Sequence, residues 1–354
     1  MREIDVAHLD DIARGAGILG TGGGGDPYLG RLLTEVAITR HGPVTLVTVD
    51  EVPPDAVVVP VSMLGAPTVG TEKLPNGTEL LAALRALERA RGAEATHLVP
   101  IEIGGMNSLV PLALAAETGL PVVDGDAMGR AFPEAQMVLP TLAGIPTSPM
   151  AVADDKGNTL VLDAVSSQWA ERIARAVCVT TGCSVYTADT VMTGAQLPGG
   201  LVAGTITLAE QLGAAVRTAR ADHANPVTAI RDLVGGVHLI TGKVTDVHRT
   251  TTDGFALGTT TVAGTDSELR LSFQNEYLLA MRDGEVVATT PDLICVLETD
   301  TGEPITTEAL RYGNRVTALA IPCDPRWTTP AGLELVGPRY FGYDCDYQGL
   351  PSDG

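Results

Sequence analysis

The chain has 354 residues, of which 45% are hydrophobic, so it can bury sizeable cores and exceeds the length at which a single core usually stops growing. A formal net charge of −20, with only 4% aromatic residues, argues against nucleic-acid binding and against attraction to acidic membrane surfaces. No stretch has the apolar length of a signal peptide or a membrane span, so we expect a cytoplasmic protein of two domains.

Cysteine and histidine usage gives no sign of disulfides or zinc. The five cysteines form no C-x-x-C pair, and the six histidines contain neither H-E-x-x-H nor H-x-H. Cys183 has the one cysteine context that suits a nucleophile, but no histidine is near in sequence, which favours a structural role. A divalent metal ion held by carboxylates is left open.

A glycine-rich run is the strongest local signal in the chain. Residues 5–19 predict a helix, and five glycines follow within residues 20–25. Such a cluster is tolerated where the backbone turns with positive φ or approaches a ligand closely. Asp26 and Pro27 then predict the N-cap and the first residue of a second helix, whose free amides can hold an anion.

We therefore predict that the run binds a small molecule through Gly22, Gly23, Gly24, Gly25 and Asp26. A purely structural tight turn is the alternative. The run also matches G-x-G-x-x-G, but that motif should follow a buried strand, whereas the pattern before it predicts a helix. A dinucleotide site is therefore disfavoured.

Residues 43–165 predict an α/β domain. Short aliphatic runs typical of buried strands alternate with helical patterns, and this alternation indicates a mostly parallel sheet. A hairpin is expected at 151–161. The predicted strands are 44–49, 56–61, 96–101 and 121–123, and the predicted helices are 77–91 and 106–118.

From Ser166 onward the pattern changes, and we place a domain boundary there, giving domains 1–165 and 166–354. Helical patterns are followed by short Thr- and Val-rich strands separated by glycine turns, which predicts a β-rich, barrel-like domain with a few helices. The predicted helices are 166–181, 208–220 and 227–233, and the predicted strands are 238–248, 254–262, 268–273, 285–290, 293–298 and 315–321.

Acidic residues follow two strands of the first domain. Glu102 comes directly after 96–101, and Asp124 and Asp126 come after 121–123. We expect the three to meet, because the carboxyl ends of parallel strands share one edge of a sheet. Paired carboxylates can share a proton, separate their pKa values for acid and base work, or hold a divalent ion. For the two aspartates, simple turn capping is the alternative.

Glycine and polar residues at the same edge predict ligand contacts. Gly104 and Gly105 let a ligand approach, and Asn107 can cap the following helix or orient a ligand. Arg130 can neutralise a carboxylate, or pair with Glu134 on a helix surface.

Two later segments, 273–277 and 337–344, place polar groups between strands and glycine turns. Either segment can fold back over the first domain or serve as an ordinary turn.

Segments along nearly the whole chain, in the same order, resemble the S-methyl thiohydantoin desulfurase family. The resemblance implies an N-terminal α/β domain and a C-terminal domain with a β-barrel component. It also implies a hydrolase-type enzyme that converts an S-methyl thiohydantoin into a hydantoin and methanethiol, without nicotinamide or flavin. The segments that carry it are 20–26, 102–107, 124–134, 192–196, 291–294, 302–308 and 337–344.

This chemistry needs a base for water, donors for developing charge and an acid for the leaving group. On this reading Glu102, Asp124 and Asp126 transfer protons or hold a metal ion, the glycine amides and Asn107 orient the ring, and Arg130 neutralises or orients one carboxylate. The family is also associated with hydantoinase and oxoprolinase proteins. The alternatives are therefore an accessory or ligand-binding subunit of such a system and, third, a nucleotide-using enzyme. We also expect a homo-oligomer. The substrate side chain, the metal and the contributions of Cys183 and 337–344 are not fixed by the sequence.

Overall fold

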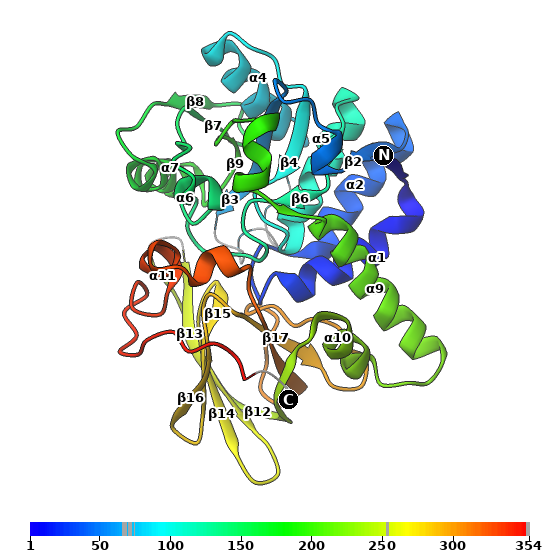
Figure 1. Cartoon of the computed structure of the whole chain (residues 1–354), viewed down its shortest axis with the longest axis vertical. Coiled ribbons are helices and arrows are strands. Elements are labelled where there is room, and N and C mark those ends of the chain that lie inside the picture. The colour runs from blue at the N-terminus through cyan, green and yellow to red at the C-terminus, as the bar shows by residue number, and fades with distance from the viewer. Residues whose placement is uncertain (66–68, 70–72, 74, 253–254, 352–354) are drawn as a thin grey trace.

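The protein is described from a computed structural model in which residues 1–65, 69, 73, 75–252 and 255–351 are placed. It contains two main sheets, one in each half of the molecule (Figure 1). The predicted combination of an α/β first half and a β-rich second half is confirmed.

The first sheet has a parallel centre and antiparallel edges. The strands β2, β5, β4 and β3 run parallel to one another, whereas the pairings of the other strands are antiparallel. The sheet is thus mixed where a mostly parallel one was predicted, because a hairpin and a strand from beyond Ser166 extend it. In spatial order the strands are β1 (Arg2–Ile4), β2 (Val44–Val47), β5 (Val122–Val123), β4 (His97–Pro100), β3 (Val57–Gly65), β9 (Ser184–Ala188), β7 (Met150–Ala153) and β8 (Thr159–Leu162), with β10 (Met192–Thr193) also pairing with β3.

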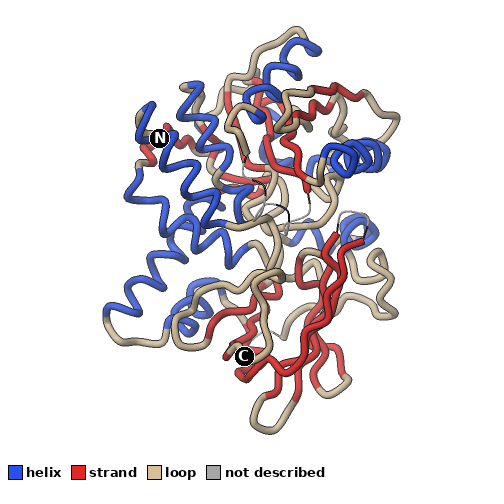
Figure 2. The backbone as a smooth tube through the Cα atoms, turned by 180° about the vertical axis from the view of Figure 1, so that it is seen from behind, coloured by secondary structure: helices blue, strands red, loops and turns tan. Residues whose placement is uncertain are grey.

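Several helices, among them α1, α2 and α9, lie together along one side of the molecule, whereas α7 lies on the other (Figure 1 and Figure 2). The predicted helices at 5–19, 77–91 and 166–181 form, with bounds shifted by no more than two residues. The α-helices are α1 (Val6–Leu19), α2 (Pro27–His41), α4 (Glu79–Arg91), α5 (Val110–Thr118), α6 (Leu139–Leu142), α7 (Ser167–Thr181), α8 (Leu197–Gly200), α9 (Thr205–Ala221), α10 (Pro226–Val234) and α11 (Pro330–Val336). Short 3-10 helices are η1 (Val49–Glu51), η2 (Gly105–Ser108), η3 (Gly194–Gln196) and η4 (Pro325–Thr328).

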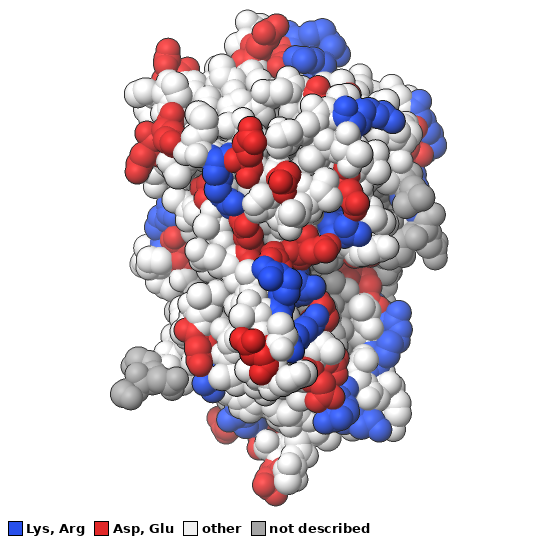
Figure 3. Space-filling model, turned by 90° about the vertical axis from the view of Figure 1, so that its right-hand side faces the viewer, with Lys and Arg blue, Asp and Glu red and all other residues white. Residues whose placement is uncertain are grey.

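Two glycines let α1 and α9 cross at close range. A Cβ atom on Gly15 would lie 1.8 Å from the carbonyl oxygen of Ala209, and one on Gly213 would lie 2.0 Å from that of Asp11. Ion pairs cover this crossing, including Arg217 with Asp11 at 2.7 Å. Figure 3, which views the molecule from the side where α1 and α9 lie in Figure 1, shows basic and acidic side chains interspersed on that face.

The second sheet is antiparallel throughout and curls into a half-barrel. Its buried face is aliphatic, with Val244, Val262, Leu271 and Val296 in one cluster. In spatial order the strands are β16 (Glu285–Thr289), β15 (Glu276–Arg282), β14 (Glu268–Gln274), β13 (Phe255–Ala263), β12 (Val237–Thr252), β18 (Arg315–Ile321) and β17 (Leu293–Glu298). Gly254, where the predicted strand 254–262 begins, lies outside the described residues.

The two halves share structure at their junction. One hydrophobic cluster joins Leu9 and Ile12 of α1 with Leu293 and Leu297 of β17. A small two-stranded sheet also pairs β6 (Gly125–Asp126) with β11 (Val202–Ala203). Within the described residues, no helix combines the length and apolar character needed to cross a bilayer.

Candidate active site

The glycine run connects α1 to α2, as predicted. Asp26 caps α2, its Oδ1 accepting the amide hydrogen of Tyr28 at 2.9 Å. The helix α1 directly precedes the run, which removes the strand that a dinucleotide-binding motif requires.

Close packing accounts for much of the glycine density. A Cβ atom on Gly24 would lie 2.4 Å from the carbonyl oxygen of Gly104, and one on Gly105 would lie 2.2 Å from that of Gly25. Gly22, Gly24, Gly25 and Gly105 also have positive φ angles. The two glycine turns can therefore pack against each other only because no side chain stands between them. This supports the alternative that part of the run is a structural tight turn.

The rest of the run is covered by the second half of the chain. A Cβ atom on Gly22 would lie 2.6 Å from the ring of Tyr277, and one on Gly23 would lie 1.9 Å from Oε1 of Glu276. The amide of Tyr277 donates to the carbonyl oxygen of Thr21 at 2.8 Å. The start of β15 is thus seated directly on the glycine run.

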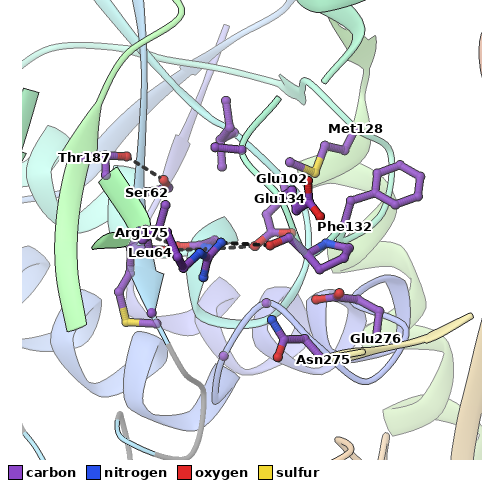
Figure 4. A pocket seen from close by; sticks show the side chains of 18 of the residues that line it. Ser62, Leu64, Glu102, Met128, Phe132, Glu134, Arg175, Thr187, Asn275 and Glu276 are labelled. Atoms are coloured by element: carbon purple, nitrogen blue, oxygen red, sulfur yellow. Dashed lines mark hydrogen bonds between the residues drawn. The ribbon is translucent and has the colours of Figure 1, made fainter. Parts of the chain in front are cut away.

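A cavity opens beside this contact, with walls from both halves of the chain (Figure 4). Of the glycines predicted to bind a ligand, Gly24 and Gly25 line it, and Asp26 is not among the lining residues. Its other polar or charged lining residues are Ser62, Glu102, Asn107, Glu134, Arg175, Thr187, Asp189, Asn275 and Glu276.

Glu102 is buried at the cavity wall, as the sequence predicted. Its Oε1 accepts from Nδ2 of Asn107 at 2.6 Å, while Oε2 has no hydrogen-bond partner among the described residues. Asn107 is itself held by the backbone of Met63, because its Oδ1 accepts from the Met63 amide and its Nδ2 donates to the Met63 carbonyl. Burial raises the pKa of Glu102 to about 8, although the Asn107 hydrogen bond opposes the rise.

Glu276 provides a second buried carboxyl from β15. Its Oε2 also lacks a partner within the described parts of the chain. Burial raises the pKa of Glu276 well above its ordinary value, and the negative charge of Glu102 raises it further. Ionisation of Glu102 therefore makes ionisation of Glu276 less favourable.

Arg130 lies buried behind these carboxyls. Its guanidinium donates to the carbonyl oxygens of Pro291 and Asp292 and to Oγ1 of Thr21, at 2.7 to 3.0 Å. Its positive charge favours ionisation of both Glu102 and Glu276. The guanidinium is thus hydrogen-bonded to the backbone of the second half rather than paired with Glu134. The Glu134 carboxylate accepts from Tyr340 and Gln136.

Neither predicted aspartate is among the residues that line the cavity, although the charge of Asp126 is near enough to raise the pKa of Glu102. Oδ2 of Asp126 accepts the amides of Ile103, Met128 and Gly129, so this side chain organises the turns behind the cavity, and burial raises its pKa to about 7.

Asp124 accepts from the amide and hydroxyl of Thr207 in α9 and borders a different hollow. The contacts of Asp124 and of Asp126 are those expected if each aspartate simply caps a turn or helix start, which was the alternative to a role in the site. No set of three His, Cys, Asp or Glu side chains in the described ranges is close enough to hold a metal ion.

Sequence reasoning did not single out Ser62, Thr187, Asp189 or Glu276 as site residues. The polar segment 273–277 carried a signal for Glu276, because that segment does fold onto the first half. The segment 337–344 also reaches the cavity rim, where the hydroxyl of Tyr340 donates to Glu134 at 2.7 Å. Cys183 lies at the end of α7 and is not among the lining residues.

Comparison with known proteins yields a solved structure with the same fold and a family. A crystal structure of a protein from Chromobacterium violaceum superimposes with a TM-score of 0.82 at 23% sequence identity, covering 99% of this chain and 100% of that one, which shows a shared fold. No curated protein sequence matches the chain. Residues 7–164 match the N-terminal domain and residues 165–350 the C-terminal domain of S-Me-THD-like proteins. Because these matches span almost the entire sequence, the chain belongs to the S-Me-THD-like family, that of S-methyl thiohydantoin desulfurase.

Proposed function

We propose that this protein hydrolyses an S-methyl thiohydantoin to a hydantoin and methanethiol in the cavity between its two halves. The observation that carries the proposal is the pair Glu102 and Glu276, two buried carboxyls that each have an oxygen atom, Oε2, without a hydrogen-bond partner among the residues the structure describes. Membership of the family supports the choice of ring. Groups of this kind are suited to act as base and acid in one reaction, since burial raises the pKa of Glu102 to about 8 and that of Glu276 well above its ordinary value.

In the proposed reaction, the reacting carbon of the ring lies between a nitrogen that bears hydrogen and one that does not. Neutral Glu276 protonates the bare nitrogen, and ionised Glu102 removes a proton from water as the water oxygen bonds to the carbon. The carbon then carries a hydroxyl and the thiomethyl group. The carbon–sulfur bond breaks, the thiolate takes the proton from Glu102, and the hydroxyl proton returns to Glu276, which leaves a carbonyl and restores both acids.

Other residues of the site have supporting roles in this proposal. Asn107 fixes one oxygen of Glu102 and so directs the other towards the cavity. Gly24 and Gly25 line the cavity wall, and we assign their amides the role of holding the oxygen that becomes the carbonyl. Arg130 favours the ionised state of the pair, which assists Glu102 as a base.

Methanethiol release from S-methyl thiohydantoin tests the proposal. Glu102→Gln and Glu276→Gln should each lower the rate about 10²- to 10⁴-fold, because each removes one positioned acid or base. Glu88→Gln is a matched control, since Glu88 is also buried but lies in α4, where its Oε1 accepts from the amide of Ala95. Asp124→Asn belongs in the same series and decides whether that residue contributes.

Two results would overturn the proposal. Wild-type rates in both Glu102→Gln and Glu276→Gln would remove the assigned roles. No thiol release by the unmutated protein, with and without divalent metal ions, together with tight binding to a hydantoinase-type protein, would favour the accessory-subunit alternative.

A further inference from the structure

We propose that the hydroxyl of Ser62 recognises the ring by accepting a hydrogen bond from a ring N–H, with Thr187 and Asp189 fixing the direction in which the Ser62 hydroxyl points its proton. The identity of the ring rests on the function proposed above. The role assigned to Ser62 is specificity: it selects rings whose nitrogen carries hydrogen.

The three side chains form a continuous hydrogen-bonded chain along one wall of the cavity. Ser62 of β3 faces Thr187 of β9 in the strand register, and their hydroxyl oxygens lie 2.9 Å apart. Oγ1 of Thr187 lies 3.0 Å from Oδ2 of Asp189, and Oγ1 of Thr190 lies 2.6 Å from Oδ1 of the same carboxylate. Ser62, Thr187 and Asp189 all line the cavity.

Proton counting fixes the direction of this chain. An ionised carboxylate can only accept, so Thr187 must donate its single hydroxyl proton to Asp189. Thr187 can then only accept from Ser62, and the proton of Ser62 is therefore directed to Thr187 and is not available to a ligand. Burial raises the pKa of Asp189 to about 6, which still leaves it ionised at neutral pH. The lone pairs of Ser62 consequently face the cavity as hydrogen-bond acceptors.

The opposite wall has complementary chemistry. Figure 4 shows Ser62 and Thr187 on one side of the cavity and Glu102 and Glu276 on the other. A ring carbon between one protonated and one bare nitrogen needs an acceptor on one side and a proton donor on the other. Ser62 supplies the acceptor and neutral Glu276 the donor, which orients the ring between the two halves of the chain. A purely structural cross-strand hydroxyl pair would have no need of a buried carboxylate behind it.

Calorimetric titration with hydantoin, 1-methylhydantoin and 3-methylhydantoin tests the inference without requiring turnover. We expect the wild-type protein to bind hydantoin at least about tenfold more tightly than one of the methylated rings, because methylation removes the donor. Ser62→Ala should bind hydantoin more weakly and discriminate between the same two rings by less than about threefold.

Variants behind Ser62 separate recognition from folding. Thr187→Ser keeps a hydroxyl that can relay the hydrogen bond and should retain the wild-type discrimination, whereas Thr187→Val should lose it. Asp189→Asn should also lose the discrimination between the rings. The asparagine amide can donate to Thr187, which reverses the direction of the hydrogen bonds and turns the Ser62 proton towards the ligand. Thermal melting of each variant verifies that it is folded.

Equal affinity of the wild-type protein for all three rings, or no binding of any, would overturn the inference. Wild-type discrimination in Ser62→Ala, or in both Thr187→Val and Asp189→Asn, would do the same. Methanethiol release is measured separately, so discrimination without thiol release would retain the inference and reject the proposed function.

Discussion

At the scale of single residues, the chain maintains carboxyl groups in places where water cannot solvate their charges. Glu102 and Glu276 are each at most 5% exposed, and Asn107 binds only one oxygen of Glu102, while the other has no partner in the described part of the chain. Such groups reduce stability once ionised, since the folded state offers them less solvation than the unfolded chain does. Their retention at a cavity is the pattern expected of groups that act on a ligand.

Glu102→Gln should therefore stabilise the protein at alkaline pH. The pKa of Glu102 is about 8 in the folded protein and 4.5 ordinarily, so the folded state is not penalised below pH 4.5 and loses stability progressively as pH rises to 8. The variant side chain is always neutral and can still accept from Asn107, so it does not lose this stability. The free energy of unfolding of the variant should exceed that of the wild type by at most about 5 kcal/mol at alkaline pH. Melting temperatures of both proteins between pH 4 and 9 check this. A constant difference over that range would show that the folded pKa is not raised.

Gly23→Ala should impair activity through contact alone. Gly23 does not have a positive φ, so alanine suits its backbone, but the added Cβ would lie 1.9 Å from Oε1 of Glu276. The carboxyl must then move, and displacement of a positioned acid should reduce thiol release about 10²-fold or more. Gly199→Ala is the matched control, because its Cβ meets nothing within 4 Å. An active Gly23→Ala protein would show that the location of Glu276 is unimportant.

At the scale of elements, hydrophobic periodicity predicted the parts of the fold whose apolar residues follow a clear period. It located α1, α7, the parallel strands of the first sheet and most of the half-barrel, and Asp26 with Pro27 marked the start of α2. It did not predict β9 or β15 as strands. Both strands are defined by partners far away in sequence: β9 pairs with β3, and the first residue of β15 follows an Asn275 with positive φ. Long-range pairing of this kind leaves little local signal.

The residues of the candidate site were also predicted only in part, because local patterns indicate only those that lie near elements with a clear sequence signal. Glu102, Asn107, Gly24 and Gly25 lie near recognisable strand ends or helix starts, and they do line the cavity. Glu276 and Thr187 reach it on the unpredicted strands, and Asp189 reaches it directly after β9. The expectation that Asp124 and Asp126 would join Glu102 rested on a shared sheet edge. Neither aspartate lines the cavity, because Thr207 binds Asp124 and backbone amides bind Oδ2 of Asp126, and only the charge of Asp126 reaches Glu102.

The crossing of α1 and α9 yields a prediction at this scale. Glycine in the middle of a helix usually costs about 0.5 to 1 kcal/mol relative to alanine, so Gly213→Ala would stabilise an isolated α9. Here the added Cβ would lie 2.0 Å from the carbonyl oxygen of Asp11, and the two helices must separate. We expect a net loss of roughly 1 to 3 kcal/mol, as for other overpacked positions. Urea unfolding measures it, and a stabilised variant would contradict the tight crossing.

At the scale of the whole molecule, the candidate site belongs to neither half alone. The carboxyl pair brings together Glu102 and Glu276, and Arg130 bonds across the same junction to Pro291 and Asp292. The family's two domains meet near residue 164, yet β9 and β10 return to the first sheet from beyond that position. Catalytic groups from two halves can be aligned only if the junction is rigid, and a shared hydrophobic cluster supplies that rigidity.

This interdependence predicts that residues 1–164 will not fold stably by themselves. Without β9, the strand β3 would become an open edge with unpaired amides and carbonyls, and without α9 the buried face of α1 would be exposed. We expect the fragment to lack the cooperative thermal transition of the full chain and to bind an exposed-surface dye. Circular dichroism and dye fluorescence, with the intact protein as control, measure both properties. A fragment that melts cooperatively near the temperature of the full chain would show instead that the first half is an autonomous domain, in which case β9 and α9 would be additions to a core that is already complete.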